Sequence, residues 1–449
     1  MNIKNWMINS TLVLLTSVMI QAVIVTEVSA SEVDASEANL QDVKISADLE
    51  QQVIEWRRHL HQHPELSNRE FATAKFITAH LKKLGIEVTT KVAHTGVVGL
   101  LKGAKPGPVV ALRADMDALP VTERVDLPFA SKATSEYNGQ KVGVMHACGH
   151  DTHVAMLMGV AELLAEQRDE LAGTVKFIFQ PAEEGAPKGE EGGAELMVKQ
   201  GVLTDPEVDV IFGLHISSKM DVGTIGYRHG GIMAAVDNFK VTVSGKQVHG
   251  STPWDGIDPV VASAQIINDL QTIVSRQLPL TKNAAVISVG SIHGGVRSNI
   301  IPESVEMVGT IRTLDPDMRL QLHEKMRNVV KHSAAVMGAT AKLELPYTTH
   351  YPITYNDPEL MDRVLPVMQK VAGDNNVNRM DAITGAEDFS FFQQKIPGVY
   401  FFIGGKSKDL PISEAPAHHT PEFFIDESGM KLGVEVMTQL TLDYMANPN

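Results

Sequence analysis

The chain has 449 residues, of which 43% are hydrophobic, and it carries a formal net charge of -15. This length and apolar content are enough to bury one large core or two medium ones, so the sequence predicts a globular protein. The acidic balance, without any basic run, argues against a nucleic-acid partner, because phosphate binding needs a surplus of Lys and Arg on one face.

The first thirty residues differ in composition from the rest. Lys4 is the only charged side chain before Glu27, an apolar stretch covers 6–25, and the small residues 28–30 offer a cleavage site. This pattern predicts a secretory signal peptide followed by a linker at 31–45, and a mature protein that is periplasmic or secreted and not attached to a membrane. An uncleaved anchor is the alternative, because about 20 apolar residues can span a bilayer.

Cys148 is the only cysteine in the chain, so an intramolecular disulfide is impossible. An exported protein that needed covalent cross-links would be expected to use disulfides. Stability must therefore come from the core, and the single thiol needs another explanation.

The pattern after the linker predicts alternating helices and strands. Two helices come first, one ending near His63-Pro64 and one over 69–84. Short apolar runs then alternate with helical patterns, and the predicted strands are 97–101, 108–115, 174–180 and 208–215, with a helix after His150. This alternation predicts an α/β fold with a mainly parallel sheet flanked by helices on both faces.

From about residue 234 the pattern is that of a small α+β unit. Its predicted elements are strand 238–245, helix 259–277, strands 284–292 and 305–313, helix 318–337 and strand 341–347. The order β-α-β-β-α-β is that of a ferredoxin-like unit. Because α/β alternation resumes with a helix at Asp357, we expect this satellite domain at 234–347 to interrupt a main domain formed by 46–233 and 348–449.

Polar side chains follow the ends of several predicted strands. Asp115 and Asp117 come after one strand, the pair Glu183 and Glu184 after another, and His215 ends a third. In open α/β sheets, ligands bind in the crevice at the carboxyl ends of the strands. We therefore expect these groups to converge although they are far apart in sequence.

Cys148 and His150 precede a helix that Asp151 or Thr152 could cap, so we expect both side chains to belong to a loop. Thiolate, imidazole and carboxylate together form a zinc-like ligand set. In an adjacent acid pair, one carboxylate can bind metal while the other takes a proton from a metal-bound water. The residues therefore favour metal-dependent hydrolysis.

Each residue also has a simpler interpretation. A lone histidine usually lies on the surface or in a satisfied core, and we place His59, His61 and His63 in that class; an adjacent Glu pair is usually solvated. Such packing does not easily explain Cys, His, Glu and His at the ends of consecutive elements of one sheet. A thiol hydrolase with Cys148 as nucleophile is the enzymatic alternative, but it leaves the Glu pair and His215 unexplained.

From residue 47 to the C-terminus the chain carries a series of distinctive stretches, which are RRHLHQHPELSNRE, LRADMDALP, MHACGHDTHVAMLMG, FIFQPAEEG, GKQVHGSTP, SNIIPESVEMVGTIRT, TGAEDFSFF and HTPEFFIDE. In order and in detail they resemble the aminoacylase/carboxypeptidase-like metallopeptidase family, and within it the amidohydrolase branch of hippurate hydrolases, N-acyl-amino-acid amidohydrolases and auxin-conjugate hydrolases. The resemblance implies a catalytic domain with a two-metal site, interrupted by a satellite domain that commonly dimerises.

The resemblance also implies a set of metal ligands, which are Cys148, His150, Glu184, His215 and His419. Glu183 then takes the role of general base. His418 stands beside His419, and the sequence alone does not exclude it, although the family pattern H-T-P-x-F favours His419.

The chain departs from the family in one motif. Where the wider family has His-x-Asp, this chain has Asp115-Met116-Asp117, so the usual histidine ligand is missing. We expect Asp117 to keep the role of orienting the base, and His150 to supply the lost imidazole.

Further residues carry implied roles outside the ligand set. His249 resembles the family histidine that reaches into the partner subunit's site and stabilises the tetrahedral oxyanion. Asn299, Arg312 and Gly385 are expected to bind the substrate.

The expected protein is thus an exported amidohydrolase, acting as a homodimer or higher oligomer on N-acyl amino acids or small hippurate-like conjugates. The expected cofactor is two divalent metal ions per subunit; Zn²⁺ suits the ligands best, while Mn²⁺ or Co²⁺ could occupy them. The alternatives are a dipeptidase or carboxypeptidase of the same family, and a non-catalytic periplasmic binding protein on the same scaffold. The sequence does not decide which acyl group and amino acid are preferred.

Overall fold

The structure is a computed structural model that describes residues 43–448. The predicted signal peptide and the linker up to residue 42 lie outside this range. Within it, no helix combines the length and the apolar character needed to cross a bilayer.

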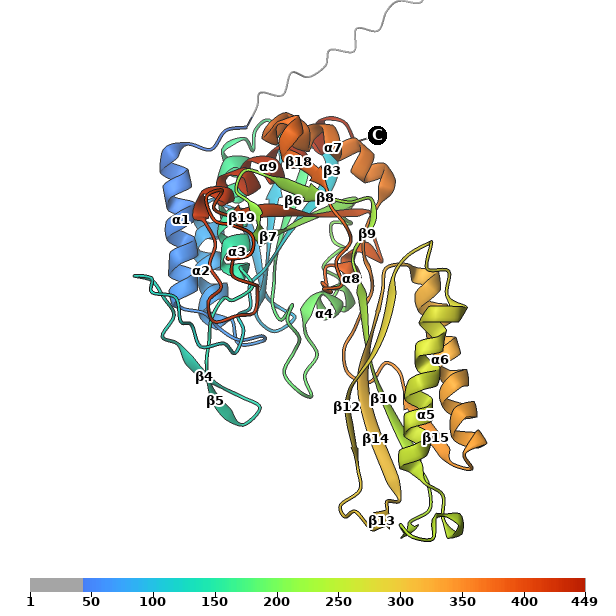
Figure 1. Ribbon diagram of the computed structural model, residues 1–449. Helices are drawn as coiled ribbons and strands as arrows, with labels where there is room; N and C mark the ends of the chain where they lie inside the picture. Colours follow the sequence, from blue (N-terminus) through green and yellow to red (C-terminus); the bar gives the residue numbers. More distant parts are fainter. Residues whose placement is uncertain (1–42, 449) are drawn as a thin grey trace, which may run out of the picture. The chain divides into compact units, whose positions relative to one another are not determined.

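An eight-stranded sheet forms the centre of the main domain, in the order β1-β2-β6-β3-β7-β19-β8-β18 (Figure 1). Its strands are β1 (Glu87–Val92), β2 (Gly96–Lys102), β3 (Lys105–Asp115), β6 (Ala172–Gln180), β7 (Val210–Asp221), β8 (Ile225–Tyr227), β18 (Val377–Arg379) and β19 (Gly398–Lys406). The central strands β6, β3, β7 and β19 run parallel to their neighbours within that group. Antiparallel pairings occur toward the edges, at β1, β2 and β8.

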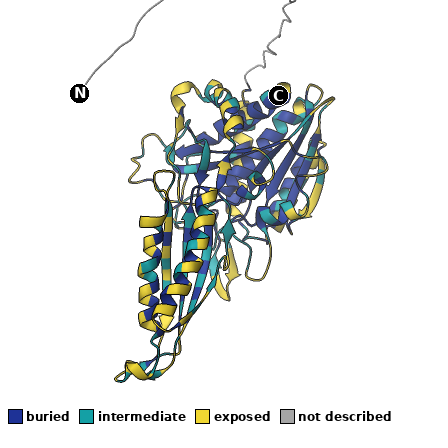
Figure 2. Ribbon diagram, turned by 90° about the vertical axis from the view of Figure 1, so that its right-hand side faces the viewer, coloured by how far each residue is buried: buried dark blue, intermediate teal, exposed yellow. Residues whose placement is uncertain are grey.

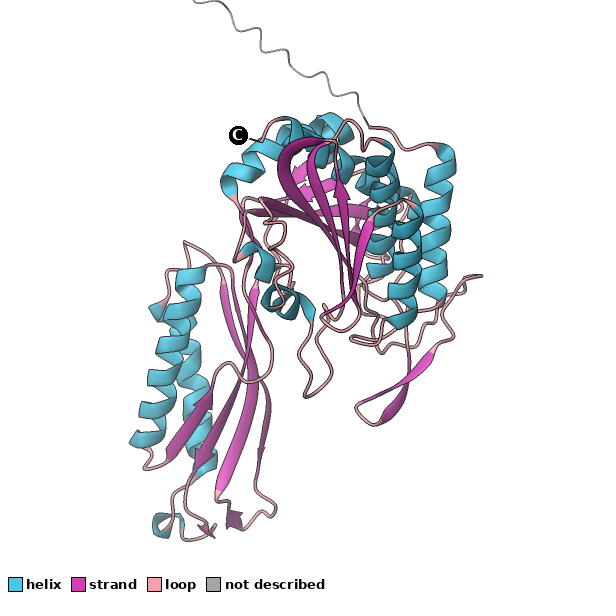
Figure 3. Ribbon diagram, turned by 180° about the vertical axis from the view of Figure 1, so that it is seen from behind, coloured by secondary structure: helices cyan, strands magenta, loops and turns pink. Residues whose placement is uncertain are grey.

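Helices cover both faces of this sheet (Figure 3). One layer consists of α1 (Ala47–Gln62), α2 (Phe71–Lys83), α3 (His150–Glu166), α7 (Pro358–Ala372) and α9 (Met430–Ala446). The opposite face carries the shorter helices α4 (Gly193–Lys199) and α8 (Ser390–Gln393).

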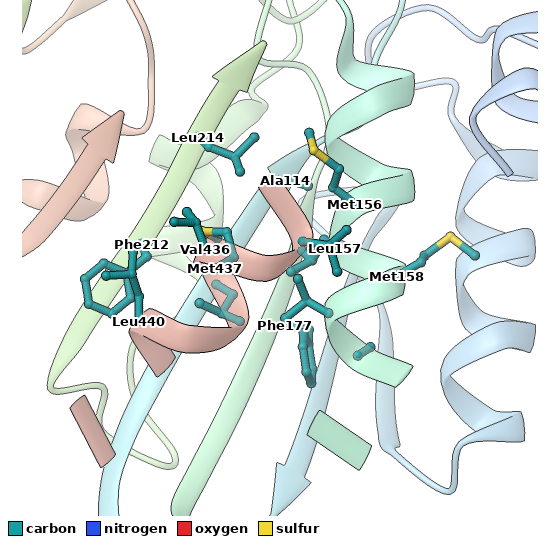
Figure 4. Packing of buried hydrophobic residues seen from close by; sticks show 14 of the residues in the cluster. Ala114, Met156, Leu157, Met158, Phe177, Phe212, Leu214, Val436, Met437 and Leu440 are labelled. Carbon is teal, nitrogen blue, oxygen red and sulfur yellow. The ribbon is translucent and has the colours of Figure 1, made fainter. Parts of the chain in front are cut away.

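Successive side chains of a strand point to opposite faces of the sheet, so one strand packs against the helices on both faces. On β6, Phe177 and Phe179 pack in the cluster that includes α3 and α9, whereas Ile178 packs with Phe389 and Tyr400 on the other face. Figure 4 shows side chains of α3 and α9 meeting those of β6 and β7. Each fully buried side chain of this size stabilises the fold by about 1.5 to 3 kcal/mol, so the two layers hold the sheet as a rigid platform.

The satellite domain has its own antiparallel sheet, in the order β12-β14-β10-β15, with β16 also paired to β10. Its strands are β10 (Ala235–Ser244), β12 (Ala285–Gly294), β14 (Ser304–Thr313), β15 (Thr340–Glu344) and β16 (His350–Tyr351). Helices α5 (Pro259–Thr272) and α6 (Pro316–Val336) lie on one face of this sheet, and their outward sides are exposed (Figure 2). The chain order β10-α5-β12-β14-α6-β15 is the ferredoxin-like order, and the predicted fold class is confirmed.

Several short elements escaped the sequence analysis. They include the hairpin β4 (Thr134–Tyr137) and β5 (Gln140–Gly143), the pair β9 (Gly230–Met233) and β17 (Thr354–Asn356), the pair β11 (Val248–His249) and β13 (Ile300–Ile301), and single turns of 3-10 helix at Pro253–Asp255, Asp374–Asn376 and Glu427–Gly429. The strands β1, β8, β16 and β18 and the short helices α4 and α8 were not predicted either. A π-helical turn, Ile273–Gln277, extends α5. The β4–β5 hairpin had a readable signal, because Asn138 and Gly139 both take the positive φ that an Asn-Gly hairpin turn requires.

Candidate metal centre

The five implied metal ligands gather on the side of the sheet where the central parallel strands have their carboxyl ends. The predicted strand end at His215 is wrong, because His215 lies within β7, which continues to Asp221. Cys148 Sγ lies 3.4 Å from His215 Nε2 and 3.2 Å from His419 Nε2, and His419 Nε2 lies 3.0 Å from Glu184 Oε1. The donor atoms of Cys148, His150 and His215 lie within 4.8 Å of one another, and so do those of Cys148, Glu184 and His419. Cys148 therefore belongs to two overlapping groups of donors.

These donor groups are better placed to bind a cation than to form hydrogen bonds with one another. His150 Nδ1 lies 2.9 Å from the backbone oxygen of Asp117, to which it donates, so Nε2 is the ring nitrogen that is placed to bind a cation. That Nε2 is buried and has no hydrogen-bond partner among the described residues. Burial and the carboxylates of Glu184 and Glu183 raise the pKa of the Cys148 thiol well above its ordinary value. A divalent cation would reverse this effect, because it stabilises the thiolate.

The loop that presents Cys148 turns at Gly149, and here the predicted helix cap is wrong. Gly149 itself is the N-cap, with φ 99°, and His150 is the first residue of α3 and not part of the loop. A Cβ at residue 149 would lie 2.5 Å from Ile216 Cγ2, so both the backbone angle and the packing require glycine. The Thr152 hydroxyl donates to the Gly149 carbonyl oxygen at 2.5 Å, and Asp151 forms a buried ion pair elsewhere, so neither side chain caps the helix.

Asp117 holds the two adjacent acids through their backbone. Its Oδ1 accepts the N–H of Glu183 at 3.1 Å, and its Oδ2 accepts the N–H of Glu184 at 3.1 Å and the hydroxyl of Ser67 at 2.8 Å. Burial alone would raise the pKa of Asp117, but hydrogen bonds from His150 and Ser67 hold it below its ordinary value. Asp117 thus remains an anion that fixes the turn carrying Glu183 and Glu184.

The turn that carries Glu183 and Glu184 has a strained backbone. A second buried carboxylate, that of Glu70, also holds this turn, and the sequence did not predict that role. Ala182 has a φ of 54°, which is unusual for a residue with a Cβ. Its N–H donates to Glu70 Oε1 at 3.0 Å, and the hydroxyl of Thr95 donates to Glu70 Oε2 at 2.6 Å. Burial and the charge of Asp117 raise the pKa of Glu70 to about 8.

Asp115, which occupies the place of the missing family histidine, is bound to other residues. Its Oδ2 lies 2.6 Å from Arg113 Nη1, and its Oδ1 lies 2.6 Å from His153 Nδ1. Arg113 Nη2 also contacts Glu387 at 2.9 Å and Asp388 at 3.1 Å. The sequence analysis did not assign Arg113, His153, Glu387 or Asp388, although a charged arginine inside an apolar strand is a signal of a buried ion pair.

The structure separates the adjacent histidines 418 and 419. His419 Nε2 faces Cys148 and Glu184, and a hydrogen bond to Glu184 raises the pKa of His419. Both ring nitrogens of His418 contact backbone groups. Nδ1 lies 3.1 Å from the backbone oxygen of Cys148, and Nε2 accepts the N–H of Ser218 at 3.2 Å. His419 is therefore the one that reaches the donor cluster.

The donor cluster opens into a cavity of about 710 Å³. Glu183, Glu184 and the predicted substrate-binding residues Arg312 and Gly385 line it, and the apolar part of the lining includes Met220, Met233, Val236, Met380, Ile383 and Phe402. The guanidinium of Arg312 is half-buried, which lowers its pKa, and no described residue forms an ion pair with it. An anionic group of a ligand would supply the missing partner.

His249 and Asn299 do not line this cavity. They belong to the satellite domain, where the N–H of Gly250 donates to the Asn299 oxygen at 2.9 Å. The His249 ring is exposed, and its Nδ1 lies 2.7 Å from Ser251 Oγ. Figure 1 places β13, which pairs with the His249 strand, at one end of the long satellite strands. The roles implied for both residues stay predictions.

The two histidines of α1, His59 and His61, and its C-cap residue His63 agree with the simpler interpretation. His59 and His63 are exposed, whereas His61 is buried and satisfied, with Nδ1 2.9 Å from Asp151 and Nε2 3.2 Å from Glu123. Burial alone would lower the pKa of His61, but these two carboxylates raise it. His61 thus anchors α1 to α3 behind the donor cluster.

Comparison with known proteins adds the family context. Residues 111–443 match the peptidase family M20/M25/M40. The chain is 43% identical over 404 residues to thermostable carboxypeptidase 2 of Saccharolobus solfataricus, covering 90% of this chain and 97% of that protein. It is 39% identical over 391 residues to the N-acetylcysteine deacetylase of Bacillus subtilis, covering 87% and 96%. The crystal structure of the Bacillus subtilis YXEP protein, a dinuclear metal-binding peptidase from the M20 family, is similar with a TM-score of 0.74 and 36% identity, covering 89% of this chain and 99% of that one.

Proposed function

Because the chain belongs to the peptidase family M20/M25/M40 of metal-dependent hydrolases, we propose that it hydrolyses the amide bond of N-acyl amino acids or related small, hippurate-like conjugates. The observation that carries the proposal is the pair Glu183 and Glu184 in the lining of the cavity. Glu184 faces His419 and Cys148, while Glu183 Oε2 lies 3.8 Å from His150 Nε2 and forms no closer ion pair among the described residues. One acid can thus hold metal while the other remains available for a proton.

The residues that would hold two divalent ions are Cys148, His150, Glu184, His215 and His419. Zn²⁺ suits thiolate and imidazole best, and Mn²⁺ or Co²⁺ could also occupy the site. When bound, such ions would polarise the scissile carbonyl and lower the pKa of a bound water toward 7.

The residues of the chain supply the proton transfer and the positioning. Glu183 takes a proton from the attacking water and delivers it to the leaving amine. Burial and the charges of Glu387 and Glu184 raise the pKa of Glu183, which favours a carboxyl group that can hold that proton between the two steps. Asp117 fixes the backbone of Glu183 during the transfer, and Arg312 binds the carboxylate of the amino-acid part.

A carboxypeptidase or dipeptidase activity at the same site is the second candidate. The 43% identity to a protein named carboxypeptidase favours it. Both reactions need a cation such as Arg312 to bind the carboxylate of the substrate. They differ in the group on the other side of the scissile amide, which is an acyl group in the first reaction and an aminoacyl or peptidyl group in the second.

We also propose an oligomeric state and a cellular location for the protein. A homodimer is proposed because His249 and Asn299 lie exposed in the satellite domain, and because β12 is an edge strand of the satellite sheet with unpaired backbone groups on one side. Export to the periplasm or the medium is proposed from the composition of the first thirty residues alone.

A substrate panel with controlled metal content tests the function. Hippurate, N-acetyl amino acids and dipeptides are assayed with chelated protein and after addition of Zn²⁺, Mn²⁺ or Co²⁺. We expect hydrolysis of the N-acyl amino acids that chelation abolishes and metal restores. Cleavage of dipeptides alone would select the second candidate, binding without turnover would indicate a binding protein, and full activity in verified metal-free protein would contradict the proposal.

A further inference from the structure

Another cavity, which we call the α2 cavity, lies in the main domain between one face of α2 and the turn that joins β1 to β2. Its volume is about 460 Å³, and none of the described residues lines both it and the cavity at the donor cluster. A cavity of this size can hold a small organic molecule. The helix contributes residues with the spacing of a single face, which are Phe71, Ala74, Lys75 and Thr78.

The ionisable side chains that line the α2 cavity are all basic, although the chain as a whole has a formal net charge of -15. Two of them have protein partners, since Arg69 Nη2 lies 2.6 Å from a carboxylate oxygen of Glu190 and His94 Nε2 donates to a backbone oxygen at 3.0 Å. The other two, Lys75 and Lys91, are exposed, and neither ammonium group forms an ion pair or a hydrogen bond with a described residue. Two such ammonium groups at one cavity match a ligand with two negative charges.

The wall of the α2 cavity has an unusual backbone where it presents these groups. Asn68, Lys91 and His94 line the cavity with φ angles of 60°, 64° and 78°, and Ala93 between the last two has a φ of 49°. Lys91 also lies where the register between β1 and β2 shifts, and such a bulge redirects a side chain. Strained residues of this kind concentrate at functional sites. The wall therefore resembles a binding site more than an ordinary surface turn.

The α2 cavity also offers an apolar contact. Phe71 is 63% exposed, so its ring is available to stack against an aromatic ligand. The hydroxyl oxygen of Thr78 is buried and has no hydrogen-bond partner among the described residues. The cavity thus combines two unpaired cations with an aromatic ring and an unsatisfied hydroxyl group.

The wall of the α2 cavity is connected to the turn that carries the proposed general base. Thr95 lines the cavity, and its hydroxyl donates to Glu70 Oε2 at 2.6 Å. The other oxygen of Glu70 accepts the N–H of Ala182 at 3.0 Å, and Ala182 directly precedes Glu183 in the chain. A ligand that changes the position of Thr95 would therefore act on the backbone of Glu183.

From these observations we propose that the α2 cavity is an effector site for a small aromatic dianion, and that its occupation changes turnover at the catalytic site. The two lysines bind the charges, Phe71 contacts the ring, and the contact between Thr95 and Glu70 transmits the effect. The binding of the dianion is independent of the proposed function, whereas the effect on turnover rests on it. A phosphate monoester and an aromatic dicarboxylate share the required chemistry.

Isothermal titration calorimetry of the metal-loaded full chain tests the binding with phenyl phosphate, phthalate, inorganic phosphate and benzoate. The preferred dianion should bind at least about tenfold more tightly than benzoate, which carries one charge, and the comparison of phenyl phosphate with phthalate identifies the anionic group. Lys75→Gln and Lys91→Gln should each weaken the binding roughly fivefold. Phe71→Ala should weaken the binding of the aromatic dianion about two- to tenfold and leave that of inorganic phosphate unchanged.

The matched control is Lys82→Gln, which removes a charge from the same helix outside the cavity and should leave the affinity unchanged. Binding that depends on neither Lys75 nor Lys91 would refute the site. Binding that is weakened by Arg312→Gln instead would place the anion in the catalytic cavity, and would also refute the site.

The effect on turnover is measured with the substrate that the panel identifies, with and without the preferred dianion. The dianion should change kcat with little effect on KM, in the wild type and in Lys82→Gln, and the effect should disappear in the double variant Lys75→Gln/Lys91→Gln. Thr95→Val should retain the affinity for the dianion but lose the change in kcat, because the contact with Glu70 is removed.

The outcomes separate this proposal from the proposed function. Lysine-dependent binding with an unchanged kcat would refute the coupling, and a rise in KM that persists in the double variant would indicate competition in the catalytic cavity and contradict the proposal. If no substrate of the panel is hydrolysed, the proposed function fails, while calorimetry still decides whether the α2 cavity binds the dianion. Circular dichroism and metal content establish that each variant is folded and loaded.

Discussion

Replacement of Arg113 by leucine should destabilise the protein more than almost any other single change behind the site. The guanidinium is fully buried and contacts three carboxylates, those of Asp115, Glu387 and Asp388, at 2.6 to 3.1 Å. Its Nε also donates to Gln180 Oε1 at 2.8 Å. The variant leaves all three acids in the core without their cation.

The expected magnitude follows from this arrangement. Removal of one partner from a buried ion pair costs about 3 to 5 kcal/mol, and because Arg113 serves three acids we expect the upper end, about 5 kcal/mol at pH 7. With a urea dependence of about 3 kcal/mol per M, the unfolding midpoint should fall by roughly 1.7 M. The matched control is Arg124→Leu, whose 2.7 Å ion pair with Glu422 is exposed and should be worth about 0 to 1 kcal/mol.

The loss should also depend on pH, with a definite sign. Burial alone would raise the pKa of Asp115, but Arg113 and the neighbouring histidines hold it well below its ordinary value. In the wild type this carboxylate therefore stabilises the fold above the pKa of the unfolded chain, and the stabilisation is lost only as pH falls through the lower folded pKa. In the variant the effect of burial on Asp115 is no longer offset by Arg113, so this carboxyl group takes up a proton more readily on folding and the difference in unfolding free energy should shrink from pH 7 to pH 5.

The assay is urea unfolding of chelated protein, followed by circular dichroism, so that metal binding does not contribute to the stability difference. Wild type, Arg113→Leu and Arg124→Leu are measured at pH 5, 6 and 7. Equal midpoints for the two variants, or a difference that does not change with pH, would refute the reasoning about the buried acids.

Three further predictions concern the chemistry. Glu183→Gln should retain metal and fold but lose at least about 10²- to 10⁴-fold in kcat, the scale of a general base, whereas Glu184→Gln should also weaken metal binding; an equal loss of metal in both would mean that the roles are assigned wrongly. Cys148→Ser should lose metal first and activity as a consequence, because a hydroxyl is a poorer ligand than a thiolate, and a covalent acyl group on Cys148 in mass spectrometry would instead support the thiol mechanism. His249→Ala should cost about 2.7 to 4 kcal/mol of transition-state stabilisation without loss of metal, and mixing it with Glu183→Gln should restore activity if the histidine acts in the partner's site. Absence of recovery, with subunit exchange demonstrated, would mean that His249 does not act across subunits.

Local patterns in the sequence were enough to predict the fold class and the main elements. Apolar residues recur with the period of a strand or a helix because each element buries one or both faces, as Phe177 and Phe179 do on one side of β6 and Ile178 does on the other. The types of donor residue were equally predictable, since Glu184 follows strand β6, His215 lies on β7, and Cys148 and His150 stand at the start of α3. These features depend on neighbours in sequence or on a general rule of sheet topology.

The remaining features depend on contacts between distant segments, which no local pattern contains. Arg113 meets Glu387 from 274 positions away, and Gly149 caps α3 because Ile216, on another strand, leaves no room for a side chain. The short strands β8 and β18 form because neighbouring backbone is present to pair with them, and their own three residues carry little signal. The ring contact between His215 and Phe402 likewise arises only because β7 and β19 pair in this register. The residues proposed to bear the chemistry were thus predicted from the sequence alone, whereas the support of the acids and the shape of the cavity were decided by the tertiary packing that brings separate strands into register.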